Sequence, residues 1–200
     1  MASATYPVVA HYYTLQGEGF WSGRAAYFIR LAGCDVGCPW CDTKESWAID
    51  GHPVVSIDEL TAAAERANSS YVVITGGEPT MHDLKPLTDQ LKTAGLEVQV
   101  ETSGAYPLTG SFDWVTLSPK KYKPPVESIY SQTDELKVIV ANRSDFSWAE
   151  QHLAQCDKSV RPVLQPEWDS PHMLPDIVDY VKQNPIWTIS LQTHKYLNIP

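Results

Sequence analysis

Short apolar runs rich in β-branched residues alternate along this chain with segments of helical character. The apolar runs predict strands at 26–31, 71–75, 97–101, 114–118, 135–140, 160–165 and 186–191. The helices are expected at 56–68, 83–94, 144–155 and 173–183. Ser56 is a suitable N-cap for the first helix, with Glu59 at its N3 position, and Gly95 follows the second helix. Strands that alternate with helices predict βαβ units and a mostly parallel sheet.

Unusual polar motifs follow the predicted strands at the point where each strand ends. They are the cysteine segment 34–41 and the segments 75–79, 101–104, 118–120, 165–168 and 192–195. In barrels of parallel strands the active site lies at this face, because the loops there converge on one opening. The sequence therefore predicts an α/β enzyme. Because the helices are too few for eight full units, we expect an incomplete, TIM-like barrel with its active site at the carboxyl ends of the strands.

Composition is that of an ordinary globular chain, and we expect residues 1–200 to form a single domain. The net charge is −9, from 15 basic and 24 acidic side chains. This acidity makes nonspecific binding to nucleic acid or to a membrane surface a poor expectation, because both require a basic face. No apolar stretch approaches the length that spans a bilayer, and the N-terminus does not resemble a secretory signal. A cytoplasmic protein is expected.

Three cysteines, Cys34, Cys38 and Cys41, have the spacing C-x3-C-x2-C, and the only other cysteine is Cys156. A closed structural metal site requires four protein ligands. Three thiolates around a four-iron cluster instead leave one iron open to a small molecule. Zinc held by the three cysteines and the nearby His52 is the alternative at this point. Cys156 is expected to be a small buried apolar residue.

The cysteine motif and its companions resemble radical S-adenosylmethionine (SAM) enzymes over nearly the whole chain. The motifs that narrow the resemblance to the 7-carboxy-7-deazaguanine synthase family are Leu15-Gln16-Gly17-Glu18-Gly19, Asp42-Thr43, Ser118-Pro119-Lys120 and the ending Gln192 to Pro200. The cysteine loop has the short form found in some members. A glycyl-radical activase of the same superfamily and a zinc-stabilised binding protein are the alternative functions.

The resemblance implies a radical SAM core and a complete reaction. The substrate would be 6-carboxy-5,6,7,8-tetrahydropterin and the product 7-carboxy-7-deazaguanine, formed by hydrogen-atom abstraction and radical ring contraction with loss of ammonia. This step belongs to queuosine and 7-deazapurine biosynthesis. The implied cofactors are a [4Fe-4S] cluster, SAM and Mg²⁺, and the radical would come from SAM rather than from a catalytic side chain. A homodimer and an electron donor such as flavodoxin or ferredoxin are implied as well.

The resemblance also implies a role for individual residues. The iron ligands would be Cys34, Cys38 and Cys41. The SAM contacts would be Trp40, Cys41, Asp42, Gly77, Glu78, Ser118, Pro119, Lys120, Gln165, Pro166, Glu167 and Trp168. The substrate contacts would be Leu15, Gln16, Gly17, Arg30, Thr75, His194 and the terminal carboxylate of Pro200, and Thr43 would bind magnesium. The remaining histidines, His11, His52, His82, His152 and His172, are expected at the surface or in structural roles.

Overall fold

The computed structural model describes residues 3–157 and 159–200, and its strands form a single nine-stranded sheet in the order β3-β1-β2-β4-β5-β6-β7-β8-β9. The strands are β1 (Thr5–Leu15), β2 (Ala25–Leu31), β3 (Val54–Ser56), β4 (Tyr71–Gly76), β5 (Glu97–Thr102), β6 (Trp114–Leu117), β7 (Glu135–Val140), β8 (Arg161–Pro166) and β9 (Thr188–Ile189). From β2 onward the order runs parallel through β4 to β9, whereas β1 is antiparallel to both β2 and β3. Because β3 and β9 are the two ends of this order, the barrel is open, which confirms the predicted fold class.

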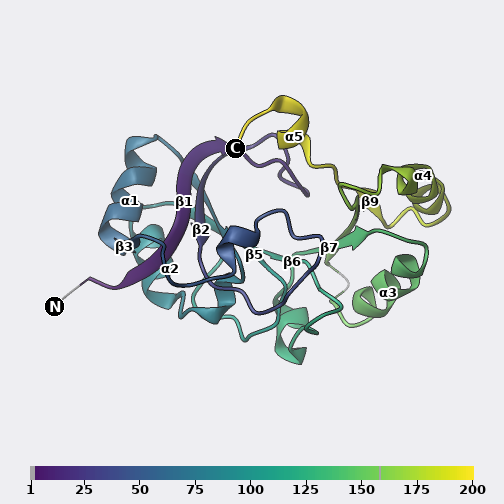
Figure 1. Ribbon diagram of the computed structural model, residues 1–200, viewed down its shortest axis with the longest axis horizontal. Coiled ribbons are helices and arrows are strands. Elements are labelled where there is room, and N and C mark those ends of the chain that lie inside the picture. The colour runs from purple at the N-terminus through teal and green to yellow at the C-terminus, as the bar shows by residue number, and fades with distance from the viewer. Residues whose placement is uncertain (1–2, 158) are drawn as a thin grey trace.

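Four helices, α1 (Ile57–Arg66), α2 (Lys85–Thr93), α3 (Ser144–Leu153) and α4 (Leu174–Gln183), cover the outer face of the sheet (Figure 1). The short α5 (Thr193–Leu197) instead lies near the carboxyl ends of the strands. The 3-10 turns are η1 (Lys44–Ser46), η2 (Pro79–Met81), η3 (Glu127–Gln132) and η4 (Pro171–Met173). The Ser56 side chain accepts a hydrogen bond from the Glu59 amide at 3.2 Å, as the capping prediction requires. None of the helices in residues 3–157 and 159–200 is long and apolar enough to cross a bilayer.

Two strands were not predicted, and one predicted strand is much shorter than expected. The segment 186–191 pairs with β8 only at Thr188 and Ile189, because the chain then leaves the sheet toward α5. The sequence of β1 contains Pro7, which argues against a strand within a sheet. A register irregularity between Val8 and Ala10 interrupts the pairing of β1 with β2 just after this proline.

Side chains alternate between two very different faces of the sheet. In β7, for example, Leu136 and Val138 belong to the main apolar core that packs against the helices, whereas Glu135 and Lys137 point to the other face. The inner face carries an unusual number of buried polar side chains, Gln99, Thr116, Glu135, Lys137 and Gln165, and the partly buried Glu101. Barrel interiors are normally filled by branched apolar residues. The inner face of this barrel therefore differs from that of an ordinary barrel, because polar side chains take the place of apolar ones.

Candidate active site

A cavity of about 560 Å³ opens at the carboxyl ends of the parallel strands, where the sequence predicts the active site. It is lined by every predicted site residue except Pro119: Leu15, Gln16, Gly17, Arg30, Cys34, Cys38, Trp40, Cys41, Asp42, Thr43, Thr75, Gly77, Glu78, Ser118, Lys120, Gln165, Pro166, Glu167, Trp168, His194 and Pro200. These residues come from segments spread over the whole sequence. The fold thus brings the predicted site residues together around a single opening.

The cysteine loop forms one wall of the cavity. Cys34, Cys38 and Cys41 are free thiols, and Cys38 is buried in a small apolar cluster with Val36. Trp47 donates its ring N–H to the Cys41 sulfur at 3.4 Å. Three free thiols on one wall of a roomy cavity fit a thiolate-bound cluster with space left for a further ligand.

The thiols of this loop are not arranged as a site for a single metal ion. Within residues 3–157 and 159–200, no three His, Cys, Asp or Glu side chains lie close enough to hold a metal ion. Burial raises the pKa of both Cys34 and Cys38, so these thiols hold their protons near neutral pH. Iron binding must therefore release these protons. His52 bonds the Glu45 carbonyl oxygen at 2.9 Å, which gives the zinc alternative no support.

The Gly76-Gly77-Glu78 turn packs directly against the cysteine loop. A Cβ atom on Gly77 would lie 2.5 Å from the Gly33 carbonyl oxygen and 2.7 Å from the Cys34 Cβ, so only glycine fits there. The buried Glu78 carboxylate accepts hydrogen bonds from Thr80, Thr102 and Ser103, through their backbone amides or hydroxyls. Glu78 therefore joins its own turn to the end of β5, and a bound ammonium group would have to share the carboxylate oxygens with these donors.

Lys120 lies between the cysteine loop and the Ser118 turn. Its ammonium donates to both the carbonyl and the hydroxyl oxygen of Ser118 at 2.6 Å and lies 5.6 Å from the centre of the Trp40 ring. Burial lowers the pKa of Lys120 to about 8, although the nearby Cys38 acts in the opposite direction. The side chain is thus fixed within the cavity and is not simply solvated.

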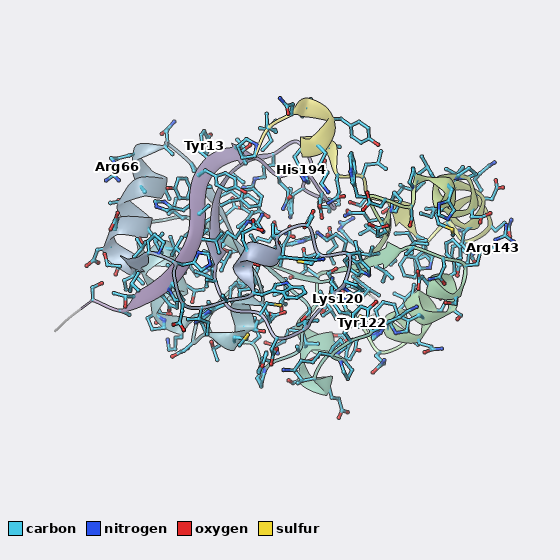
Figure 2. The ribbon with its side chains drawn as sticks, viewed as in Figure 1. Tyr13, Arg66, Lys120, Tyr122, Arg143 and His194 are labelled. Carbon is cyan, nitrogen blue, oxygen red and sulfur yellow. The ribbon has the colours of Figure 1, made fainter. Side chains whose placement is uncertain are left out.

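The segment Leu15–Gly19, which we call the substrate loop, is joined to the C-terminal segment 192–200, which we call the tail. Thr193 donates its backbone N–H and its hydroxyl to the Gly17 carbonyl oxygen, both at 2.9 Å. The His194 ring packs so closely on Gly17 that a Cβ there would lie 2.2 Å from Nδ1. Figure 2 shows His194 below the yellow tail, near the middle of the molecule, with Arg66 and Arg143 at its two ends. The loop and the tail together cover one side of the cavity.

Arg30 and Thr75 are direct neighbours on the parallel strands β2 and β4. Within residues 3–157 and 159–200, no carboxylate lies within 4.0 Å of the Arg30 guanidinium, although the side chain lines the cavity. Tyr12 and Phe28, paired across β1 and β2, stack at 5.8 Å with an interplanar angle of 9° and line the same wall. An unpaired cation beside an aromatic wall is suited to a flat ligand with an anionic group.

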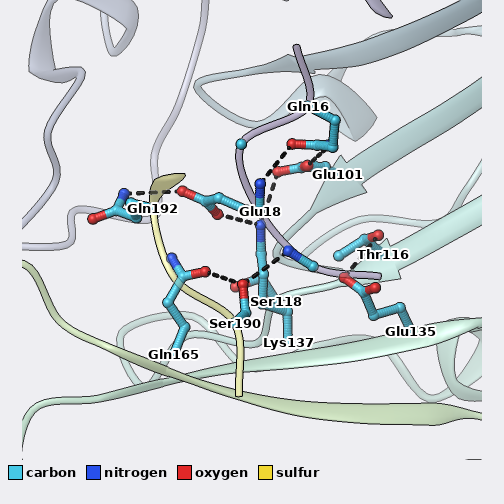
Figure 3. A network of polar contacts seen from close by, with 12 residues as sticks. Gln16, Glu18, Glu101, Thr116, Ser118, Glu135, Lys137, Gln165, Ser190 and Gln192 are labelled. Carbon is cyan, nitrogen blue, oxygen red and sulfur yellow. Dashed lines mark hydrogen bonds and ion pairs between the residues drawn. The ribbon is translucent and has the colours of Figure 1, made fainter. Parts of the chain in front are cut away.

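A charged network lies at the base of the cavity and was missed by the sequence prediction (Figure 3). Lys137 donates to Glu18 at 2.5 Å and to Glu101 at 3.0 Å, and Gln16 donates to Glu101 at 2.8 Å. Gln192 of the tail donates to Glu18 at 2.9 Å. The signal for Lys137 was available, because it is a lone cation in an apolar strand, as is Arg30.

The other histidines and Cys156 lie away from this chemistry. His11 bonds the Tyr27 hydroxyl at 2.6 Å, and His82 bonds the Ala32 carbonyl at 2.7 Å just before the cysteine loop. His152 bonds Tyr130, also at 2.6 Å. Cys156 is half-buried against the main core. These positions agree with the structural roles predicted for them.

Comparison with known proteins points to one enzyme family. Residues 28–139 match the family model described as the radical SAM superfamily. The 7-carboxy-7-deazaguanine synthase of Synechocystis sp. is 50% identical over 199 residues, covering 100% of this chain and 96% of that protein. The enzyme of the same name from Flavobacterium psychrophilum is 52% identical, covering 97% and 92% respectively. A crystal structure of QueE from Escherichia coli superposes with a TM-score of 0.86 at 34% identity, covering 95% of each chain.

Proposed function

The chain belongs to the 7-carboxy-7-deazaguanine synthase family of the radical SAM superfamily, and we propose that it converts 6-carboxy-5,6,7,8-tetrahydropterin to 7-carboxy-7-deazaguanine with loss of ammonia. Membership of this family excludes the zinc-binding and activase alternatives. In radical SAM enzymes a [4Fe-4S] cluster cleaves SAM reductively and supplies a 5′-deoxyadenosyl radical. The product would serve queuosine or another 7-deazapurine pathway.

The Arg30 guanidinium, which has no carboxylate within 4.0 Å in the described part of the chain, is the observation that carries this assignment. It lies in the cavity beside a hydroxyl from Thr75 and an aromatic pair. A carboxylate on a flat ring would pair with the guanidinium, with the ring against the aromatic wall. We assign further substrate contacts to Leu15, Gln16, Gly17, His194 and Pro200, all of which line the same cavity.

We assign the cluster and SAM to the other half of the cavity. Cys34, Cys38 and Cys41 would each hold one iron. The SAM contacts would come from four segments at the ends of strands or loops: Trp40 to Asp42, Gly77-Glu78, Ser118 to Lys120, and Gln165 to Trp168. Lys120 and Trp40 already lie together, which supports a shared cofactor wall.

Thr43 is the proposed magnesium ligand. Its hydroxyl lies 3.8 Å from the Cys41 sulfur, between the cysteine wall and the rest of the cavity. One hydroxyl is a poor site for magnesium, which prefers an octahedral shell of hard oxygen ligands. The substrate carboxylate and water would have to complete the shell. We therefore predict that calorimetry detects magnesium binding only after the carboxypterin is added, and tight binding to the substrate-free enzyme would contradict this assignment.

The remaining proposals concern the molecule as a whole. We propose that residues 1–200 work as one radical SAM domain, because the predicted contacts are distributed from residue 15 to residue 200. A homodimer, a flavodoxin or ferredoxin as electron donor, and a cytoplasmic location are proposed from the family. A cytoplasmic location would also keep the cysteine thiols reduced.

One anaerobic assay tests the proposed reaction. The reconstituted enzyme, given carboxypterin, SAM, magnesium and a reductant, should release ammonia and the deazapurine in equal amounts. Because SAM is recycled, 5′-deoxyadenosine should not accumulate in step with the product. An enzyme that cleaves SAM but leaves the carboxypterin unchanged would refute the assignment.

A further inference from the structure

Lys137 is a buried cation that none of the family motifs includes. Its side chain is only 4% exposed, and it lies in the middle of β7 between the core residues Leu136 and Val138. Replacing a buried ion pair by apolar side chains is often neutral or stabilising. A lysine at this position is therefore not explained by stability alone. Since the Lys137 side chain also lines the cavity, we expect its role to concern the substrate site.

The two carboxylates bound to Lys137 belong to different parts of the site. Glu18 lies in the substrate loop, and Glu101 lies in β5. The Glu101 carboxylate also holds the Gln16 amide at 2.8 Å, and Gln16 in turn accepts the Glu18 backbone N–H at 3.1 Å. Both side chains that face inward from the loop are thus tied to one ammonium group, Glu18 directly and Gln16 through Glu101 (Figure 3).

The tail is tied to the same point. Gln192 donates to the second oxygen of Glu18 at 2.9 Å, so the Glu18 carboxylate lies between Lys137 and the tail. Without the ammonium group, Glu18 and Glu101 would be two partly buried carboxylates that repel each other. The substrate loop would then be pushed away from β5, and the tail with it.

Glu18 and Lys137 keep their charges near neutral pH. Burial alone would raise the pKa of Glu18, but the charge and hydrogen bond of Lys137 lower it to about 2. Burial would likewise lower the pKa of Lys137, but Glu101 and Glu18 raise it. Neither group exchanges its proton near neutral pH, so a role in holding geometry fits better than a role in proton transfer.

We propose that Lys137 is a positioning residue for the ring contraction, which acts through Glu18 to hold the substrate loop and the tail in the shape that binds the carboxypterin. This inference rests on the proposed function. Lys137 makes no hydrogen bond to a side chain assigned to SAM, among the residues that the structure describes. Its loss should therefore weaken pterin binding and leave SAM binding almost unchanged.

A double-mutant cycle with Lys137→Met and Glu18→Gln tests the proposal. Binding of carboxypterin and of SAM is measured by calorimetry on the reconstituted enzyme without reductant, so that no turnover occurs. Each single variant should bind the pterin about tenfold to a hundredfold more weakly, the loss expected for a hydrogen bond to a charged group. Because Lys137 acts through Glu18, the double variant should lose little more than either single variant.

Lys121→Met is the matched control. Lys121 also pairs with a buried carboxylate, Asp145, but lies outside the substrate cavity. The Lys121→Met variant should bind carboxypterin and SAM with affinities within about twofold of those of the unmodified enzyme. Two results would overturn the proposal. One is a loss of pterin affinity in the double variant that equals the sum of the two single losses. The other is an equal loss of pterin and SAM affinity in the Lys137 or Glu18 variants.

If Lys137→Met fails to fold because it leaves two carboxylates unpaired, the double variant and Glu18→Gln decide the question. The double variant should then bind the pterin as weakly as Glu18→Gln, and a clearly weaker double variant would overturn the proposal. Failure of the unmodified enzyme to bind the carboxypterin would overturn the proposed function as well. If the unmodified enzyme and the Glu18→Gln variant both bind the carboxypterin normally, the proposed function stands and only the role of Lys137 is overturned.

Discussion

Charged side chains inside a protein are costly unless each finds a partner, and this barrel holds a paired and an unpaired cation. Lys137 has two carboxylates, whereas Arg30 has none within 4.0 Å among the described residues. Both are lone cations in apolar strands, so the sequence could single out either of them. The pairing of Lys137 joins residues from three distant segments, and no local pattern reveals it. Arg30 could be assigned from the sequence only through its place in a family motif.

At Arg30, the variant Arg30→Lys tests the geometry of the proposed carboxylate contact. Lysine keeps the charge but cannot form two parallel hydrogen bonds to a carboxylate. We expect the KM for the carboxypterin to rise about tenfold, with the affinity for SAM little changed. Steady-state kinetics with each substrate varied in turn would measure this, and an unchanged pterin KM would remove Arg30 from the site.

At Glu135, burial beneath the substrate loop raises the pKa from 4.5 to about 7, despite opposing effects from Lys137 and the Phe20 amide. The folded protein therefore binds more protons than the unfolded chain between these two values, and this contribution to stability is lost as the pH rises through 7. The loss amounts to roughly 3 kcal/mol at most. Glu135→Gln should remove this dependence, so the variant should gain stability relative to the unmodified protein as the pH rises from about 5 to about 8, which thermal unfolding of both proteins at the two pH values would measure. Equal differences in both proteins would contradict the prediction.

At the scale of elements, the short apolar runs in the sequence were enough to place most of the sheet. The apolar runs identified all of the parallel strands, because a strand covered by helices carries a strong apolar pattern. They overestimated β9, whose two residues are both exposed at the end of the sheet. They missed β1, because its proline and polar residues weaken the same pattern. The short helix α5 was missed too, since five residues show too little periodicity.

The variant Gly77→Ala adds one methyl group and tests the packing between the end of β4 and the cysteine loop. Gly77→Ala would place a Cβ within 2.8 Å of three atoms, two of them backbone carbonyl oxygens that have little room to move. We expect the loop to be displaced and the iron content after reconstitution to fall severalfold. Gly51→Ala is the control, because a Cβ there meets nothing within 4 Å and costs only the strain of a φ of 89°. Equal iron contents in the two variants would contradict the prediction.

At the scale of the whole molecule, the barrel is open, and the substrate loop and the tail cover one side of its cavity. The predicted convergence of polar motifs could be read from the sequence, because the carboxyl ends of parallel strands share one edge. The contact between the tail and the loop could not be read in this way. It joins residues 17 and 193 through hydrogen bonds that leave no local trace in the sequence.

Removal of Pro200, or addition of a C-terminal tag, tests the part that the tail plays. Pro200 lines the cavity, and its carbonyl oxygen accepts the Thr14 hydroxyl at 3.3 Å. Either change would remove or block the substrate contact that we propose for Pro200. We expect the KM for the carboxypterin to rise sharply or turnover to stop, while iron and SAM binding remain. Unchanged kinetics in a tagged enzyme would remove Pro200 from the substrate site.

The hydrogen bonds between Thr193 and Gly17 span nearly the full length of the chain, and this has a consequence for biosynthesis. Contacts between residues so far apart in the sequence form slowly, because the entropy of loop closure must be lost before they contribute. On the ribosome, the sheet up to β8 can emerge and pair while the tail is still inside the exit tunnel. The nascent enzyme would therefore be able to receive iron before it is able to receive the pterin.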